Sequence, residues 1–193
     1  MSDDGVNTGR RRFLTAATTV VGAGGAVGVV VPFVGSWNPS AKAKAAGAPV
    51  KADVSKLEPG QMVVVEWRGK PVFIVRRTAE QLKVLEQEDP TLKDPSSATA
   101  VQPTYVGENT RSIKPEIMVV LGICTHLGCS PKFQPSTVVA NAKEFFCPCH
   151  GSRFDMAGRV FKGSPASANL EVPPYKFEND GVIVVGVDQG ETA

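Results

Sequence analysis

Every cysteine and histidine of this 193-residue chain lies in one of two short segments in its C-terminal half. The first segment, residues 124–129, reads Cys-Thr-His-Leu-Gly-Cys, and the second, residues 147–152, reads Cys-Pro-Cys-His-Gly-Ser. Cysteine and histidine at such short spacing are typical of metal sites. Each segment can supply one thiolate and one imidazole, and Gly128 and Gly151 permit a tight loop backbone. The sequence therefore predicts a metal centre with four ligands: Cys124, His126, Cys147 and His150.

Two chemistries fit two thiolates and two imidazoles. One is structural zinc in a closed tetrahedron, and the other is a [2Fe–2S] cluster with two cysteines on one iron and two histidines on the other. The remaining cysteines, Cys129 and Cys149, could join as a disulfide that ties the two segments together. A disulfide requires an oxidising compartment, and a zinc site has no particular need of that tie. The leftover pair therefore favours the iron–sulfur cluster.

The N-terminal region predicts a membrane anchor. No charged residue occurs between Phe13 and Trp37, whereas about 20 residues suffice to cross a hydrocarbon core of ~30 Å. The run exceeds a secretory apolar region of about 7–15 residues, so we expect residues 13–37 to be a retained, uncleaved transmembrane helix. Arginines within residues 1–12 hold that end in the cytoplasm, which places the rest of the chain in the periplasm of a bacterium.

Residues 10–14, Arg-Arg-Arg-Phe-Leu, also resemble a twin-arginine export signal. An ordinary anchor with a basic flank is the alternative. The distinction matters because the twin-arginine route carries folded proteins, so a cofactor can be inserted before export.

Residues 38–50 are small and polar and predict a flexible linker, followed by a folded domain over residues 51–193. Short β-rich runs alternate with turn signals, and Thr78 and Gln81 form a capping pattern for a helix over residues 78–87. The expected strands are residues 62–67, 71–75, 117–121, 144–146 and 182–187. This pattern predicts a mainly β, antiparallel domain. The formal net charge of +2 gives no field that would favour nucleic acid.

Together these features resemble the Rieske subunits of quinol–cytochrome c oxidoreductases, the cytochrome bc complexes. The resemblance covers nearly the whole chain: the anchor, the linker, the hairpin around Trp67–Val72, the helical insertion, both cysteine segments and the stretch Asn169–Tyr175. It implies a Rieske-type antiparallel β-sheet domain whose small cluster-binding subdomain has its loops within residues 122–168. It also implies one Rieske-type [2Fe–2S] cluster as the cofactor.

The resemblance assigns roles to the cysteines and histidines of the two segments and to Ser152. Cys124 and Cys147 would bind the inner iron, and His126 and His150 the outer iron. A disulfide would join Cys129 to Cys149. Ser152 would donate a hydrogen bond to a bridging sulfide.

The implied function is that of the iron–sulfur subunit of a respiratory ubiquinol–cytochrome c reductase, a translocase active only within its complex. His150 would contact ubiquinol, and the subunit would accept an electron with proton release, pass it to a membrane c-type cytochrome and so contribute to the proton gradient. The implied partners are cytochrome b and c-type cytochrome subunits in a dimeric complex. The implied location is the bacterial inner membrane, crossed once, with a cytoplasmic N-terminus and a periplasmic head.

Two positions depart from the family pattern. Phe154 stands where the family often has a tyrosine that donates to a cysteine ligand, so we expect a lowered reduction potential. Residues 164–167, Ser-Pro-Ala-Ser, stand where a Gly-Pro-Ala-Pro loop is common.

Three other classes of protein share part of this pattern. They are the Rieske small subunit of another periplasmic oxidoreductase such as arsenite oxidase, a soluble oxygenase ferredoxin, and a zinc-stabilised, membrane-tethered binding module. A soluble ferredoxin would lack both the anchor and the second cysteine pair.

Overall fold

The computed structural model describes residues 5, 7–135 and 143–189. Parts of two predicted regions, residues 1–4 and 6 of the N-terminus and residues 136–142 of the cluster-binding region, lie outside the described residues. The chain divides into two compact units, residues 1–45 and 46–193. Each unit is described by itself.

The first unit is built on α1 (Thr8–Gly35), a 28-residue helix. It begins before the uncharged run because Asn7 caps it, accepting a hydrogen bond from the backbone N–H of Arg10 at 3.1 Å. At about 1.5 Å per residue the helix is about 42 Å long. Its most apolar 18-residue window has a mean hydropathy of 1.8 and no buried residue. Among the described residues, α1 is the one helix long and apolar enough to cross a membrane.

A short helix, α2 (Ala41–Ala46), lies inside the segment that the sequence analysis treats as a linker. The Ser40 hydroxyl accepts a hydrogen bond from the backbone N–H of Ala43 at 3.1 Å, which caps the helix. Alanine and lysine have high helix propensity, which explains why the segment is helical although none of its residues is buried.

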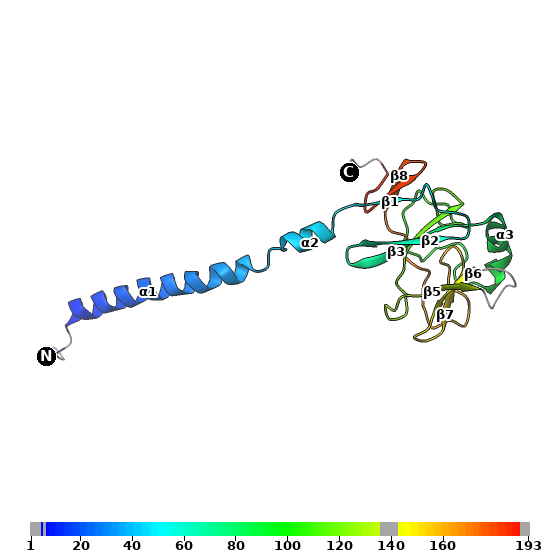
Figure 1. Cartoon of the computed structure of the whole chain (residues 1–193). Helices are drawn as coiled ribbons and strands as arrows, with labels where there is room; N and C mark the ends of the chain where they lie inside the picture. Colours follow the sequence, from blue (N-terminus) through cyan, green and yellow to red (C-terminus); the bar gives the residue numbers. More distant parts are fainter. Residues whose placement is uncertain (1–4, 6, 136–142, 190–193) are drawn as a thin grey trace. The chain divides into compact units, whose positions relative to one another are not determined.

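The second unit contains three antiparallel sheets of three strands each (Figure 1). Their orders are β1-β9-β8, β2-β3-β4 and β5-β6-β7. The bounds are β1 (Val50–Asp53), β2 (Met62–Trp67), β3 (Lys70–Arg76), β4 (Ile117–Leu121), β5 (Lys132–Pro135), β6 (Lys143–Cys147), β7 (Ser152–Phe154), β8 (Tyr175–Asn179) and β9 (Val182–Val185). All the strand pairings within these three sheets are antiparallel, so the predicted mainly β architecture is confirmed.

The β2-β3-β4 sheet lies between the other two sheets (Figure 1). Phe73 of β3 stacks on Phe145 of β6 with ring centroids 5.5 Å apart. Every residue of β4 is buried, as its unbroken apolar sequence predicts. The chain leaves β4 directly into the first cysteine segment, so the core fixes the start of that loop.

The predicted helix is present as α3 (Ala79–Glu88), with the capping box between Thr78 and Gln81. A 3-10 helix, η1 (Asp89–Thr91), follows it, and the chain then runs without regular structure to β4. This region between β3 and β4 is called the insertion below.

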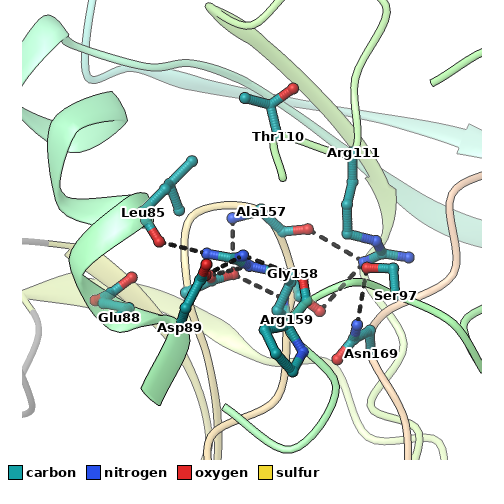
Figure 2. Close-up of polar contacts among 12 residues, drawn as sticks. Leu85, Glu88, Asp89, Ser97, Thr110, Arg111, Ala157, Gly158, Arg159 and Asn169 are labelled. Carbon is teal, nitrogen blue, oxygen red and sulfur yellow. Dashed lines mark hydrogen bonds and ion pairs between the residues drawn. The ribbon is translucent and has the colours of Figure 1, made fainter. Parts of the chain in front are cut away.

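Two fully buried arginines bind the insertion to the segment that follows the second cysteine segment (Figure 2). Arg159 donates from Nη2 to the carbonyl of Leu85 in α3 at 2.7 Å. Arg111, within the insertion, donates from Nη2 to the carbonyl of Leu170 at 2.7 Å and from Nη1 to that of Ala157 at 3.1 Å. The insertion therefore supports the back of the region that carries the cysteine segments.

Candidate metal centre

Both cysteine segments fold into the same kind of hydrogen-bonded loop. The carbonyl of Cys124 accepts from the N–H of Gly128 at 3.0 Å, and that of Cys147 accepts from Gly151 at 2.9 Å. Both glycines have a positive φ, 85° and 80°, a region that residues with a side chain rarely adopt. The first loop follows β4 and the second joins β6 to β7. The expectation that these glycines shape the loops is thus met.

Cys124 and Cys147 are free thiols, each only 2% exposed. Burial raises the pKa of the Cys147 thiol, and the neighbouring Cys124 sulfur raises it further. Two buried sulfurs this close to each other ionise readily only when a cation binds them, because each thiolate repels the other. The pair therefore suits a metal that supplies positive charge.

Cys129 and Cys149 are joined in a disulfide, the pairing that the family resemblance implies. The sulfur atoms of Cys129, Cys147 and Cys149 all lie within 4.8 Å of one another. That grouping alone would suggest a three-cysteine metal site. Disulfide sulfurs are not thiolates, however, so only Cys147 of the three remains as an anionic ligand.

The two histidine rings meet edge to face, with centroids 4.7 Å apart. His150 is exposed, whereas His126 is half-buried. The Nδ1 atom of His126 is buried and has no hydrogen-bond partner among the described residues. A buried nitrogen of this kind is costly unless something binds it. Two buried thiols, one orphaned imidazole nitrogen and a second imidazole beside it fit a metal with two sulfur and two nitrogen ligands.

Residues 164–168, called the covering loop, are held against both cysteine segments. The buried Ala166 donates its N–H to the Ser152 hydroxyl oxygen at 3.0 Å. Thr125, which lies between two of the predicted ligands, donates its hydroxyl to the carbonyl of Ala168 at 2.5 Å. Because the Ser152 oxygen acts as an acceptor here, its own proton is available for a second partner.

No sequence pattern predicts the roles of Thr125 and Leu127, which flank His126 in the first cysteine segment. Thr125 ties the first segment to the covering loop, a contact between residues 43 positions apart that no local pattern reveals. Leu127 is 72% exposed and follows directly after His126. The sequence does contain one indication of this exposure. Leu127 lies between a predicted ligand and a turn glycine, and a leucine in so short a loop cannot reach the core.

Charged side chains, several of them buried, lie where the insertion contacts the segment after the second cysteine segment (Figure 2). Arg159 binds Asp155 through Nε and Asp89 through Nη1, each at 2.7 Å. Glu88 is 2% exposed, and burial raises its pKa to about 8. The carboxylates of Asp155, Glu144 and Asp89 act in the same direction, and the Arg159 guanidinium acts against them.

Comparison with known proteins agrees with this geometry. The family described as "Rieske [2Fe-2S] domain" matches residues 93–176, which include both cysteine segments and the covering loop. The fold and the paired loops thus define a Rieske-type iron–sulfur protein, and the predicted [2Fe–2S] cofactor is confirmed at the level of the family.

Relatives of known function extend the match to nearly the whole chain. The ubiquinol-cytochrome c reductase iron-sulfur subunit of Allochromatium vinosum is 56% identical over 98% of this chain and 94% of its own length. The subunit of the same name from Blastochloris viridis is 44% identical over 96% of this chain and 97% of its own. The mitochondrial cytochrome b-c1 complex subunit Rieske of Candida albicans is 39% identical over 90% of this chain and 75% of its own. The chain belongs to the family of ubiquinol-cytochrome c reductase iron–sulfur subunits.

Residues 1–40 match a further family, described as "Ubiquitinol-cytochrome C reductase Fe-S subunit TAT signal". This match confirms the twin-arginine interpretation of residues 10–14. Together with α1, it fits a membrane-anchored Rieske subunit.

Proposed function

We propose that Cys124 and Cys147 hold the inner iron of the cluster and that His126 and His150 hold the outer iron. The observation that carries this assignment is the pair of free, buried thiols beside two imidazoles and a separate disulfide. The unpartnered Nδ1 of His126 supports a nitrogen ligand at that atom. The exposed His150 is the ligand best placed to meet another molecule.

Ser152 is proposed to donate its hydroxyl proton to a bridging sulfide. Its side chain is fully buried, and its oxygen already accepts the N–H of Ala166. A hydroxyl in that position has one proton left to give and no access to water. A donor to cluster sulfur stabilises the more negative, reduced form.

The protein is proposed to accept one electron from ubiquinol and to pass it to a c-type cytochrome. When bound, a Rieske cluster takes up an electron at a potential of about −150 to +300 mV. His150 would bind the quinol hydroxyl through its free ring nitrogen, and that nitrogen would take up the proton released from this hydroxyl. The exposed Leu127 beside His126 provides an apolar contact for the protein that holds the quinol.

Residues 1–12 are proposed to be cytoplasmic, 13–37 to span the bacterial inner membrane, 38–50 to form a hinge and 51–193 to be the periplasmic domain. The arginines before the apolar run and the length of α1 support this orientation. The hinge would let the head alternate between cytochrome b and a c-type cytochrome within a dimeric complex. Shortening residues 41–48 should reduce turnover while leaving the cluster intact, and unchanged turnover would remove the hinge from the proposal.

The full chain, purified from membranes, tests the assignment through its metal content and spectroscopy. We expect two irons per chain and the low-temperature EPR signal of a reduced histidine-ligated [2Fe–2S] cluster, whereas stoichiometric zinc would contradict it. Cys147→Ser should remove the signal, and Ser130→Ala, a change at an exposed residue next to the first segment, should leave it. Co-purification with a b-type cytochrome separates this function from that of an arsenite oxidase subunit.

A further inference from the structure

Lys93 lies in the insertion, 31 residues before the first predicted ligand, yet its backbone is fixed beside the cluster-binding region. Its N–H donates to the carbonyl of Val160 at 3.0 Å, and the preceding residue, Leu92, forms a β-bridge with Phe161. On its other side, the Asn169 amide donates to the carbonyl of Asp94 at 3.0 Å. Figure 2 shows Asn169 near the insertion residue Ser97. The backbone of Lys93 is therefore fixed relative to the segment that follows the second cysteine segment.

The Lys93 ammonium group binds the covering loop at two points. Its Nζ atom lies 2.6 Å from the carbonyl oxygen of Ser164 and 2.8 Å from that of Ala166. Hydrogen bonds from a charged donor are roughly twice as strong as those between neutral groups. One side chain from the insertion thus binds the backbone on both sides of Pro165, an arrangement called the clamp below.

The clamped segment is also the one that contacts Ser152. Ala166 receives Lys93 at its carbonyl and gives its own N–H to the Ser152 hydroxyl. The Ser164 hydroxyl accepts the N–H of Arg153, the residue after Ser152, at 3.1 Å. Movement of the covering loop would therefore change the hydrogen bonds made to Ser152 and to the residue after it.

The covering loop has a particular need for such a clamp. Proline fixes φ and removes conformational freedom from a chain. The loop contains one proline, Pro165, and carries Ser167 where the related pattern has a second one. Two charge-assisted bonds from Lys93 restrict the same stretch of backbone by another means.

We propose that Lys93 is a positioning residue for the cluster. Its ammonium holds the covering loop closed, aims the Ser152 proton at cluster sulfur and raises the reduction potential. This inference rests on the ligand and Ser152 assignments proposed above. Reduction adds one negative charge to the cluster, so a well-aimed hydroxyl donor favours the reduced state.

Redox titration of the full-length, cluster-loaded protein tests the proposal. Lys93→Met removes the charge and both bonds, whereas Lys93→Arg keeps a cation with several donors. Lys162→Met is a matched control, because Lys162 is also a lysine whose Nζ binds a backbone carbonyl, that of Pro90 at 2.8 Å. At a fixed ambient potential, we expect Lys93→Met to lower the ratio of reduced to oxidised protein about three- to tenfold, and tenfold is about 59 mV for a one-electron couple. Lys93→Arg and Lys162→Met should stay close to wild type.

A wild-type potential in Lys93→Met, with iron content and EPR signal intact, would overturn the role of Lys93 and leave the ligand assignment standing. An equal fall in Lys162→Met would also overturn it, since general loss of charge would then suffice. If Lys93→Met does not retain the cluster, Lys93→Gln replaces it, and a wild-type potential there has the same meaning.

A double-mutant comparison tests the route through Ser152. The effect of Lys93→Met should shrink when it is introduced into Ser152→Ala, because the proton it positions is no longer present. An equal fall in both backgrounds would show that the ammonium acts by charge alone and would refute a positioning role.

Discussion

Arg159 offers the sharpest test of how the insertion is held on the cluster-binding region. Its fully buried guanidinium binds Asp155 and Asp89, and it also donates to the Leu85 carbonyl. Arg159→Met keeps an extended apolar side chain in the same space but removes every donor. Asp155, which is also fully buried, then loses its cationic partner.

The size of the effect follows from what Asp155 retains. Removing one partner of a buried ion pair costs about 3–5 kcal/mol, because a buried charge is left uncompensated. Asp155 still accepts two backbone hydrogen bonds, from Ala157 at 2.8 Å and from residue 159 itself at 2.7 Å. We therefore expect the lower end of the range, a loss of about 3 kcal/mol. At about 2–4 °C per kcal/mol for a domain of this size, Tm falls by about 6–12 °C.

Urea unfolding followed by circular dichroism measures this loss. Arg68→Met is the control, because the exposed Arg68 lies over the Trp67 ring at 4.4 Å and such a contact contributes only about 0.5–1 kcal/mol. Adding Asp155→Asn to Arg159→Met should recover part of the stability by removing the unpaired charge. A loss below about 1 kcal/mol in Arg159→Met, or no recovery in the double variant, would refute the idea that this ion pair anchors the insertion.

Three further outcomes are expected. Replacing Cys129 and Cys149 by serine removes a cross-link between residues 20 positions apart. The free energy of unfolding should fall by about 3 kcal/mol on the chain-entropy model. Urea unfolding compared with the oxidised wild type measures this, and equal stability would contradict the prediction. Because burial raises the pKa of Glu88 from 4.5 to about 8, the folded state holds a proton that the unfolded state releases, so this group makes stability fall as pH rises from about 5 to 8. Glu88→Gln should flatten that fall in Tm measured against pH, and an unchanged slope would assign it to other groups. Phe154→Tyr should raise the reduction potential if the added hydroxyl donates to a ligand sulfur; a redox titration showing no change or a fall would count against this.

Much of the site could be predicted because its chemistry is local in sequence. The cysteine segments contain their own ligands, disulfide cysteines and turn glycines within a few residues. The hairpin of β2 and β3 could also be predicted, because a turn sequence with a glycine separates two β-rich runs. Arg68 and Gly69 adopt the positive φ values that a tight hairpin turn requires. The capping box of α3 depends on Thr78 and Gln81 alone. In each case a few neighbouring residues determine the structure.

The rest depends on contacts between distant residues. β1 pairs with β9 more than 120 residues away, and its four residues, Val50–Asp53, carry no pattern that would mark a strand. β5, β7 and β8 were missed for the same reason, since each is short and is stabilised by its neighbours. Arg111 lies among polar loop residues, and Arg159 lies in a loop without regular structure. An arginine is usually exposed in such positions, yet both are fully buried. Only the folded chain reveals the carbonyls and carboxylates that satisfy them.

The separation of two free thiols from one disulfide has a consequence for the order of assembly. Four cysteines can form two disulfides in three ways, and an oxidant that meets the protein before its metal could produce any of them. With the proposed ligands already bound to iron, only Cys129 and Cys149 remain to react. If the cluster is loaded in a reducing cytoplasm and the folded domain is then exported along the twin-arginine route, as the proposed location implies, the cofactor would act as a protecting group that selects the correct disulfide.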